Sequence, residues 1–436
     1  MRKNRNIWRG FLILMLLVTL LMTSTTIGNT KIKIRYSSWG DPAELELNKR
    51  IIAAFEAKNP DIEVEFIPIV ENYEDKITAM YVAGNEPDVM YTSPTRAYDL
   101  FKSGLIEPLD SFFKAEPQWL DDSKYFTRAY IPYTDRETRQ IYATVNGTNT
   151  WAVFYNKDMF TKAGLPYPNQ YDEKNNWTWS TFLTVTRKLT KDLNGDGKID
   201  QWGTQVQNTA RFWMAFIWQN GGDLFNKSLT EITIDQPKAV EALQFIQDLV
   251  YKYQVAPTPA QLESIGAAQV PRGFGLFTNR VATCIWQTYI VQDAKMIKDF
   301  KWDMAHLPKK VTRACAISGG AYRISSRSKN KEAAWRFAKF FQEPEAQRMI
   351  AEAGLITPFD RSIAYSDIFL KSPGAPEHHQ VRLEAIEYGR PAEYQHKNYS
   401  KIVDIATQEI DLMLLGKQDA KETARKIKLR TASLMQ

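Results

Sequence analysis

Apolar and polar residues alternate with two different periods along the first part of the chain. Ile32, Ile34 and Tyr36 recur at every second position, which is typical of a strand that is buried on one face. The segment that follows predicts a helix, because Asp41 is a favourable N-cap and Asn59 precedes the proline at which the apolar periodicity stops. From residue 31 the chain therefore opens with a strand and a helix.

The same alternation continues to residue 91. A second strand is predicted over residues 62–66, a second helix runs from Tyr73 to a terminating Gly84, and a short third strand covers residues 88–91. Consecutive parallel strands need a crossover, and helices supply it here. The order strand, helix, strand, helix, strand therefore predicts a parallel sheet covered by helices.

A second α/β unit is predicted beyond a polar stretch at residues 146–150, which we interpret as a hinge between two lobes. An apolar strand at residues 151–155 opens this unit. The later elements expected from periodicity are an aromatic helix at 212–218, a long helix at 237–253, a strand at 281–286, and helices at 331–341 and 345–353. The C-terminal run KETARKIKLR predicts a surface helix.

The first 28 residues have the layout of an export signal. A basic stretch (MRKNRNIWRG) leads into 12 apolar residues at 11–22 and then into small polar residues. A bilayer span needs about 20 apolar residues, so a removed signal peptide is favoured over a permanent anchor. Many exported bacterial binding proteins carry a lipid on a cysteine at this point, but the first cysteine of this chain is Cys284. We expect an exported protein without a lipid anchor of that kind.

The charge balance argues against a nucleic-acid partner. The chain has 56 basic and 50 acidic residues and a formal charge of +6. Four basic residues (Arg2, Lys3, Arg5 and Arg9) lie in the first 28 residues, which contain no acid, so the body is nearly neutral at 52 against 50. A nucleic-acid track needs basic residues concentrated on one face. With 44% hydrophobic residues the chain can bury cores of two or more lobes.

Two cysteines, Cys284 and Cys315, exclude a disulfide framework and a cysteine-rich metal site. Export leaves a single bridge open, although their apolar settings favour two buried thiols. No catalytic motif stands out among the four histidines, and His378 and His379 lie in a proline-rich loop that we expect to be solvated. Acid pairs such as Asp121 and Asp122 leave a glycosidase dyad open.

One loop has the spacing of a calcium site. Its oxygen donors stand at positions 1, 3 and 5, a glycine stands at 6 and a backbone carbonyl at 7, but Gly203 occupies position 12, where a bidentate acid is expected. The candidate ligands are Asp192, Asn194, Asp196, Lys198 and Asp200. The loop is either a structural calcium site or a turn rich in Asp and Asn. No other cofactor is required by the sequence.

Four longer stretches share the order and motifs of a known family. They are residues 73–113 with Pro-Asp-Val and Gly-Leu-x-x-Pro-Leu, residues 151–190 with Tyr-Asn-Lys-Asp and Thr-Trp-x-x-Phe, residues 212–226 (FWMAFIWQNGGDLFN), and residues 318–359, which open with Ser-Gly-Gly. Together they resemble the extracellular solute-binding proteins of carbohydrate ABC transporters, the maltose-binding-protein-like family 1. The stretches cover nearly the whole chain from residue 31.

The resemblance implies a two-lobed α/β fold of the type II periplasmic-binding-protein class, with hinge-linked lobes and a ligand cleft between them. It implies an N-lobe of residues 29–145 and 287–338 and a C-lobe of residues 146–286 and 339–436. The implied function is that of the substrate-binding subunit of a carbohydrate ABC importer. Such a protein is a monomer that binds a sugar without a chemical step and delivers it to the membrane permease.

A sugar site needs flat aromatic rings for the apolar faces of a pyranose, and polar side chains for its hydroxyls. Trp39 follows the first predicted strand at its carboxyl end, where α/β sheets bind ligands, and Gly40 and Asp41 stand beside it. The motif match adds further candidates from both lobes. They are Ser93, Arg96, Trp151, Tyr155, Trp213 with Trp218, Trp286, Ser318, Gly319, Gly320 and Tyr322.

Other functions stay open at this point. An exported glycan hydrolase or lyase would present similar aromatic residues, and a sugar-sensing module for a receptor would have the same fold. The abundance of aromatic residues, with 12 Trp and 20 Tyr, favours an oligosaccharide over a monosaccharide.

Overall fold

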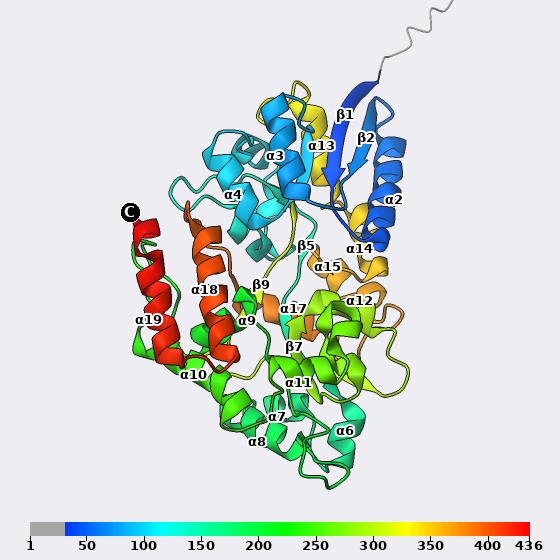
Figure 1. Ribbon diagram of the computed structural model, residues 1–436. Helices are drawn as coiled ribbons and strands as arrows, with labels where there is room; N and C mark the ends of the chain where they lie inside the picture. Colours follow the sequence, from blue (N-terminus) through cyan, green and yellow to red (C-terminus); the bar gives the residue numbers. More distant parts are fainter. Residues whose placement is uncertain (1–30) are drawn as a thin grey trace, which may run out of the picture.

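The computed structural model describes residues 31–436 and shows two lobes, each built around its own sheet and core. The signal segment predicted at residues 1–28 lies outside the described residues. The first lobe occupies the upper half of Figure 1 and the second lobe the lower half. The expected two-lobed α/β class is confirmed.

The first lobe contains a five-stranded mixed sheet in the order β2-β1-β3-β10-β4. Strands β1, β2 and β3 are parallel, whereas β10 runs antiparallel to both neighbours. Its strands are β1 (Ile32–Ser38), β2 (Ile62–Pro68), β3 (Val89–Thr92), β4 (Thr144–Val145) and β10 (Ala321–Ile324). Its helices are α2 (Pro42–Lys58), α3 (Tyr73–Ala83), α4 (Pro94–Lys102), α5 (Asp110–Ala115), α13 (Lys331–Phe340) and α14 (Pro344–Ala353), with short 3₁₀ turns η1 (Pro117–Leu120) and η2 (Thr127–Tyr133).

Local signals explain these elements. The Asp41 side chain accepts hydrogen bonds from the backbone N–H groups of Ala43 and Glu44 and so caps α2, with Pro42 in its first turn. Gly84 ends α3 in the left-handed region at φ 67°, where an L side chain is strained. The predicted alternation of strands and helices over residues 31–92 is therefore confirmed.

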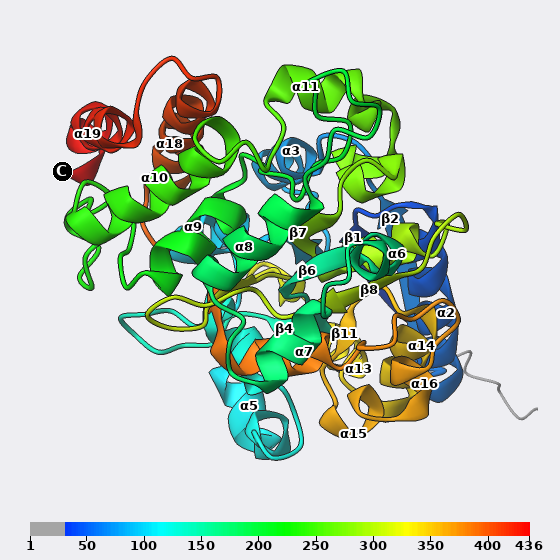
Figure 2. The same cartoon turned by 90° about the horizontal axis from the view of Figure 1, so that it is seen from below.

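The second lobe contains the antiparallel sheet β7-β6-β8, seen from below in Figure 2. Its strands are β6 (Trp151–Asn156), β7 (Thr283–Gln287) and β8 (Trp302–Ala305). The helices of this lobe between residues 157 and 294 are α6 (Lys157–Lys162), α7 (Pro168–Glu173), α8 (Trp179–Leu189), α9 (Ala210–Gln219), α10 (Pro237–Tyr251), α11 (Pro259–Ser264) and α12 (Val291–Ala294). The short turns η3 (Ala267–Gln269), η4 (Pro271–Gly273), η5 (Gly275–Thr278) and η6 (Thr288–Ile290) complete it.

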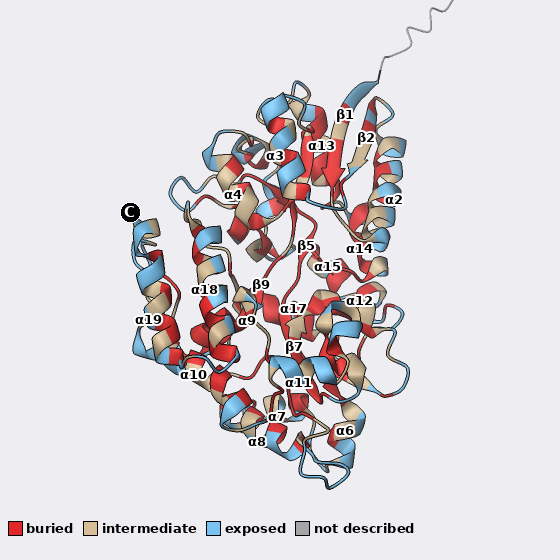
Figure 3. Cartoon of the chain, viewed as in Figure 1, coloured by how far each residue is buried: buried red, intermediate tan, exposed pale blue. Residues whose placement is uncertain are grey.

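Three segments cross between the lobes and form the hinge. Residues 146–150 join β4 to β6 and include β5 (Gly147–Thr148), which pairs with β11 (Thr357–Pro358) of a second crossing segment. The third, residues 318–320, joins β9 (Cys315–Ile317) to β10. Residues in all three crossings are buried, as the red ribbon in the middle of Figure 3 shows.

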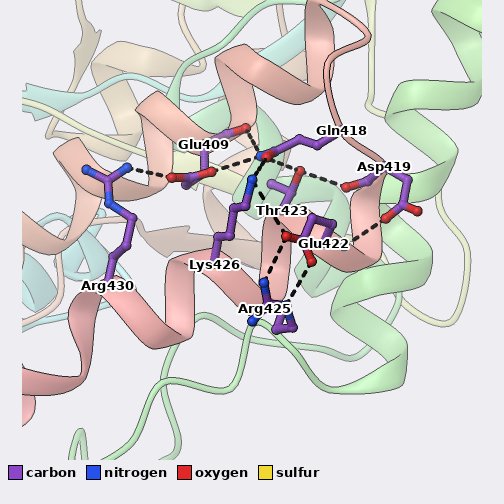
Figure 4. A network of polar contacts seen from close by, with 8 residues as sticks. All are labelled: Glu409, Gln418, Asp419, Glu422, Thr423, Arg425, Lys426 and Arg430. Carbon is purple, nitrogen blue, oxygen red and sulfur yellow. Dashed lines mark hydrogen bonds and ion pairs between the residues drawn. The ribbon is translucent and has the colours of Figure 1, made fainter.

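After β11 the chain packs α15 and α16 against α14, returns to the second lobe where β12 pairs with β9, and ends in a helical hairpin. These last elements are α15 (Arg361–Ala364), α16 (Asp367–Leu370), α17 (Val381–Glu384), η7 (Ala385–Tyr388), β12 (Gly389–Pro391), α18 (Tyr399–Leu414), α19 (Ala420–Thr431) and η8 (Ala432–Met435). A polar network holds α19 against α18 (Figure 4): Arg430 pairs with buried Glu409 at 2.6 Å, and Gln418 Nε2 donates to Glu409 and to Thr423.

The lobe boundaries differ from the predicted ones. Strand β8 pairs with β6 in the second sheet, so residues 302–305 do not belong to the first lobe as expected. Conversely, Phe341, Ile350 and Phe359 lie in the core of the first lobe. The reason is that the crossings at residues 318–320 and at β11, after α14, fall where the sequence shows no marked change of composition.

Candidate functional site

A cavity of about 670 Å³ lies between the two lobes. The lining from the first lobe includes the carboxyl ends of β1 and β3, where parallel sheets present ligand-binding loops. The second lobe contributes Arg211, Arg272, Gln287 and Tyr289. The hinge forms the floor with Asn146, Asn149, Ser318, Gly319, Gly320, Leu355 and Ile356.

One wall of the cavity is aromatic. Trp39 packs against Tyr73 edge to face and against Tyr91 at a tilt, each with ring centroids 5.0 Å apart. Tyr91 lies 5.0 Å from Tyr322, which in turn stacks on Phe341 at 3.8 Å. Because each ring is held by its neighbours, the wall is a preformed apolar surface.

Gly320 allows this wall to lie against the hinge backbone. A Cβ atom at this position would come within 2.1 Å of the Tyr91 ring, and the Gly320 N–H donates to the Tyr91 hydroxyl at 3.1 Å. The sequence predicted that the glycine pair exposes backbone to a sugar. At Gly320 the exposed backbone contacts Tyr91 instead. Any other residue at 320 would displace the Tyr91 ring.

Polar groups stand at the floor and on the opposite side of the cavity. The Asn146 Nδ2 donates to the Tyr322 hydroxyl at 3.0 Å, while its buried Oδ1 has no hydrogen-bond partner among residues 31–436. Gln287 Nε2 donates to Ser318 Oγ at 2.7 Å, which links the second lobe to the hinge. Arg211 pairs with Glu393, and its Nε also lacks a partner. Unsatisfied buried polar atoms are uncommon and mark positions where a ligand group can bind.

The charges around the cavity are balanced. Glu393 raises the pKa of Arg211, and Arg272 pairs with Asp293 at 3.0 Å. Burial raises the pKa of Asp41, but hydrogen bonds from Tyr289 and from backbone N–H groups outweigh it and leave the pKa below its ordinary value. Burial raises the pKa of Glu44, whose carboxylate accepts the Asp41 N–H at 3.0 Å. Each lining arginine therefore has an acidic partner.

The structure brings eight of the predicted ligand-binding residues to this cavity. They are Trp39, Gly40, Asp41, Ser93, Ser318, Gly319, Gly320 and Tyr322. All of them follow a first-lobe strand or lie on the hinge or on β10, where the reasoning from strand ends and from the glycine pair placed them. Ser93 also donates to Glu74 at 3.0 Å.

Arg96 and Tyr155 lie away from the cavity. The Arg96 side chain points from α4 to Thr78 of α3 on the outer surface of the first lobe. Tyr155 is fully buried, and its hydroxyl donates to Asp303 at 3.1 Å and accepts from Asn169 at 3.2 Å. Their assignment to the ligand site is corrected, because a motif match does not fix the direction of a side chain.

Four predicted tryptophans do not line the cavity either. Trp151 and Trp213 are buried in the core of the second lobe, and Trp218 is buried in the same core. Trp286 packs edge to face on Phe274 at 5.3 Å, on the far face of β7 from Gln287. These aromatic side chains fill the hydrophobic core, which is the commoner role of aromatic residues at helical and strand spacing.

Sequence reasoning missed several lining residues. Tyr91 lies two residues before the predicted Ser93, and Asn146 lies inside the predicted hinge. Both stand at or next to the end of a strand, so considering every residue at the strand ends would have found them. Tyr73 begins a helix that the sequence did predict. Arg272 and Tyr289 belong to short 3₁₀ turns for which the sequence has no periodic signal.

The predicted calcium loop is exposed and folded on itself. Asp192 accepts from the N–H groups of Gly195 and Gly197 at 2.7 and 2.8 Å, and Asp200 accepts from the N–H of Leu193 at 2.8 Å. Asn194 and Asp196 each accept from the N–H two residues on. Position 12 offers no side-chain ligand because it is Gly203. A larger residue would not fit there, since its Cβ would lie 2.1 Å from the Thr186 carbonyl oxygen.

Two other expectations are settled by packing. His379 is not solvated: it is buried beside Arg382, and burial lowers its pKa to about 3. Asp121 and Asp122 bind neighbouring groups of their own segment, Ser123 and Thr127, and do not line the cavity. The pair does not form a dyad facing the cleft.

The two cysteines are both buried and unpaired, as the apolar settings suggested. Burial raises the pKa of Cys315 to about 12 and that of Cys284 further, so neither is reactive near neutral pH. Among residues 31–436, no helix is both long and apolar enough to cross a bilayer.

The family described as bacterial extracellular solute-binding protein matches residues 39–348. A putative binding protein of Brucella abortus is 23% identical over 372 residues, which cover 84% of each chain. An ABC substrate-binding protein of Listeria monocytogenes, solved in complex with cycloalternan, is 25% identical, with a TM-score of 0.78 over 93% of this chain and 99% of its own. The sugar-binding protein MalE of Xanthomonas citri has a TM-score of 0.78 at 19% identity, over 92% of this chain and 97% of its own.

Proposed function

Because this chain belongs to the bacterial extracellular solute-binding protein family, we propose that it is the substrate-binding subunit of a carbohydrate ABC importer. It captures a sugar, of oligosaccharide size, in the cavity between its lobes and delivers it to the membrane permease. The Listeria relative solved with cycloalternan supports a carbohydrate ligand. Binding proteins of this two-lobed kind close on their ligand by hinge motion.

The observation that carries the proposal is the pairing of an aromatic wall with unsatisfied polar atoms in one cavity. Trp39 and Tyr91, supported from behind by buried Tyr322, offer flat apolar faces, and the ring C–H groups of a pyranose fit such faces. Asn146 Oδ1 and Arg211 Nε lack partners within the described part of the chain and can bind hydroxyl groups. A neutral polyol with apolar faces satisfies both requirements.

The balanced charges favour a neutral sugar over a phosphorylated one. Recognition of a phosphate group requires a cationic side chain or a helix N-terminus that is free to donate. Arg211 and Arg272 are both engaged by carboxylates, and the N-terminus of α2 is capped by Asp41. A phosphate in this cavity would have to displace one of these acids.

Binding without a chemical step is also supported by the arrangement of the carboxylates. Glycoside hydrolysis needs two carboxyl groups on opposite sides of the scissile bond. The acids lining the cavity, Asp41 and Glu44, lie within the first turn of α2, and the carboxylate of each accepts a hydrogen bond from the backbone N–H of the other. They occupy one wall and do not flank a bound sugar.

The remaining parts of the proposal concern export and partners. The basic and apolar segment at residues 1–28 serves as the export signal, and the chain functions as a monomer with the permease as its membrane partner. The loop of Asp192, Asn194, Asp196, Lys198 and Asp200 holds a structural calcium ion. In support, Gly197 takes the left-handed conformation, with φ 85°, that the sixth position of such a loop requires.

The first test is thermal unfolding of the purified protein against a panel of neutral mono- and oligosaccharides and sugar phosphates. A ligand at 100 times its dissociation constant adds about 2.7 kcal/mol of stability, which shifts the midpoint visibly. We expect one or a few neutral oligosaccharides to shift it, to be recovered unchanged, and to bind Trp39→Ala about 30-fold more weakly, or about 2 kcal/mol. Repeating the scan with calcium tests the loop, and Asp192→Asn should abolish any calcium shift.

Trp286→Ala is the matched control, because Trp286 is also half-buried but packs on Phe274 away from the cavity. It should lower the midpoint of the free protein and leave the sugar affinity unchanged. Hydrolysis of the sugar, or a stronger loss of affinity in Trp286→Ala than in Trp39→Ala, would overturn the proposal. A shift produced only by sugar phosphates would overturn the preference for neutral ligands.

A further inference from the structure

Asp41 is engaged on both of its carboxylate oxygens by groups of the protein itself. Oδ1 accepts from the N–H groups of Ala43 and Glu44 at 3.0 Å each, which caps α2. Oδ2 accepts from the Tyr289 hydroxyl at 2.6 Å and from Gln292 Nε2 at 3.3 Å. The carboxylate is therefore occupied by protein donors at the very position where sequence reasoning expected it to bind ligand.

The two halves of this contact come from different lobes. Asp41 follows β1 of the first lobe, whereas Tyr289 and Gln292 belong to η6 and α12, which pack on the β6 and β7 side of the second lobe. Figure 1 shows α12 directly below the first lobe, near α14. A hydrogen bond between residues 248 positions apart thus bridges the mouth of the cavity that both line.

Arg272 reinforces the bridge from a strained backbone. It takes the left-handed conformation (φ 56°), which a non-glycine residue adopts only when its surroundings enforce it. Its guanidinium lies 4.9 Å from the centre of the Tyr289 ring, pairs with Asp293 at 3.0 Å and reaches Asp41 at 3.9 Å. The strain therefore places a cation where Tyr289 and Asp41 meet.

We propose that Asp41, Tyr289, Gln292 and Arg272 form an interlobe clasp, which closes the cavity through protein contacts alone and slows the release of a bound sugar. Only the slower release of sugar rests on the proposed function, whereas closure of the cavity does not depend on it. The clasp needs no bridging ligand, since every donor and acceptor belongs to the chain. Asp41 is thus a positioning residue for closure and leaves hydroxyl binding to other groups.

Such a clasp gives the protein a closed population without sugar. The equilibrium between open and closed forms is then already partly shifted toward the closed form before a ligand binds. This shift raises the apparent affinity for the ligand. A hydrogen bond to an ionised oxygen contributes more than a neutral one, so its removal should open the lobes and speed sugar release by about tenfold. The half-exposed position limits the effect to that order.

The test measures the distance between the lobes in the full-length protein with and without sugar. Spin labels on Glu46→Cys and Lys298→Cys report it, since both positions are exposed and the two native cysteines are buried. Tyr289→Phe removes only the clasp hydroxyl. Tyr251→Phe is the matched control, because its hydroxyl donates to the Leu414 carbonyl at 2.7 Å, away from the cavity.

Asp41→Asn provides a second and independent variant. Asparagine caps a helix about as well as aspartate, so α2 stays intact while the charge that holds Tyr289 and Arg272 is lost. If Asp41 and Tyr289 act through one contact, the double variant should be no more open than either single variant. Two independent effects would add and would overturn the clasp as a unit.

The outcomes separate this inference from the proposed function. A closed population in the free wild-type protein that falls in Tyr289→Phe and not in Tyr251→Phe supports the clasp, whether or not any sugar binds. Faster sugar release from Tyr289→Phe supports the proposal that the clasp slows release. A free protein that is fully open, or a Tyr289→Phe variant with wild-type distances and release rate, would overturn the clasp even if sugar binding is confirmed.

Discussion

The hinge and the clasp both join the two lobes, but they are built from different kinds of contact. In the hinge, backbone groups pair directly: Asn149 and Ser318 exchange two N–H to carbonyl bonds of 2.7 and 2.9 Å, and β5 pairs with β11. In the clasp, four side chains meet at the edge of the cavity, and three of them are half-buried. The buried pairing serves as a pivot, whereas the side-chain contact can be made and broken.

A buried arginine holds the hinge together. Arg382 is fully buried and donates to the carbonyls of Gly354 and Leu355 and to Asn149 Oδ1, at 3.1 to 3.4 Å. Burial lowers its pKa to about 9, so it remains charged at neutral pH. It thus connects two of the crossing segments to α17.

The largest effect is expected from breaking this connection. Arg382→Met keeps the length of the side chain but leaves buried carbonyls without donors, and we expect the free energy of unfolding to fall by about 2–4 kcal/mol. Denaturant unfolding measures it. Arg425→Met is the control, since Arg425 is exposed and, within residues 31–436, its ion pair is with Glu422 on the same helix. A loss below about 1 kcal/mol would show that the hinge does not depend on Arg382.

A smaller effect is expected where the hinge strands touch. A Cβ at Gly147 would lie 2.0 Å from the Thr357 carbonyl, so Gly147→Ala should force β5 and β11 apart. Such overpacking costs about 1–3 kcal/mol of stability. Gly164→Ala serves as a control with open space around it, although its own left-handed backbone (φ 63°) carries some strain. Equal losses in the two variants would contradict a special role for the contact at Gly147.

The smallest effect concerns the pH dependence of the clasp. The pKa of Asp41 is lowered in the closed form, chiefly because hydrogen bonds from Tyr289 and the backbone exceed the effect of burial. Its contribution to closure is complete above the ordinary pKa of an aspartate, about 4, and is lost as the pH falls through the lowered value. Glu44 and Arg272 lie beside the same carboxylate, and Asp293 pairs with Arg272.

The spin-label distances should therefore stay constant from pH 7 to pH 5 and shift toward the open form below about pH 4. Partial exposure limits the change to about two- to fivefold in the ratio of closed to open molecules. In Asp41→Asn this step should disappear. A step of the same size in that variant would assign the transition to Glu44 or to another group, and not to Asp41.

The periodic elements of both lobes could be predicted from the sequence because their signals are local. The cap at Asp41, the terminating Gly84 and the strand pattern at Ile32 and Ile34 each depend on neighbours within one or two turns. The same locality explains why strand ends such as Trp39 were placed correctly at the cavity.

Features that depend on distant partners could not be predicted. Trp213 is an aromatic residue in a segment that matches the family motif, so the sequence made it a candidate for the cleft. Only the packing of α9 against β9 and α10 decides that it is buried. Tyr289 stands in a short turn, and its role comes from Asp41, which is far away in the chain. Periodicity contains no information on such pairs, which is why the clasp was missed and Trp213 was misplaced.

The position of β10 has a consequence for how the chain is made. This strand lies between β3 and β4 in the first sheet, yet it is formed by residues 321–324. The first sheet therefore cannot be completed until about three-quarters of the chain has been synthesised, and its folding depends on contacts of long sequence separation, which form slowly.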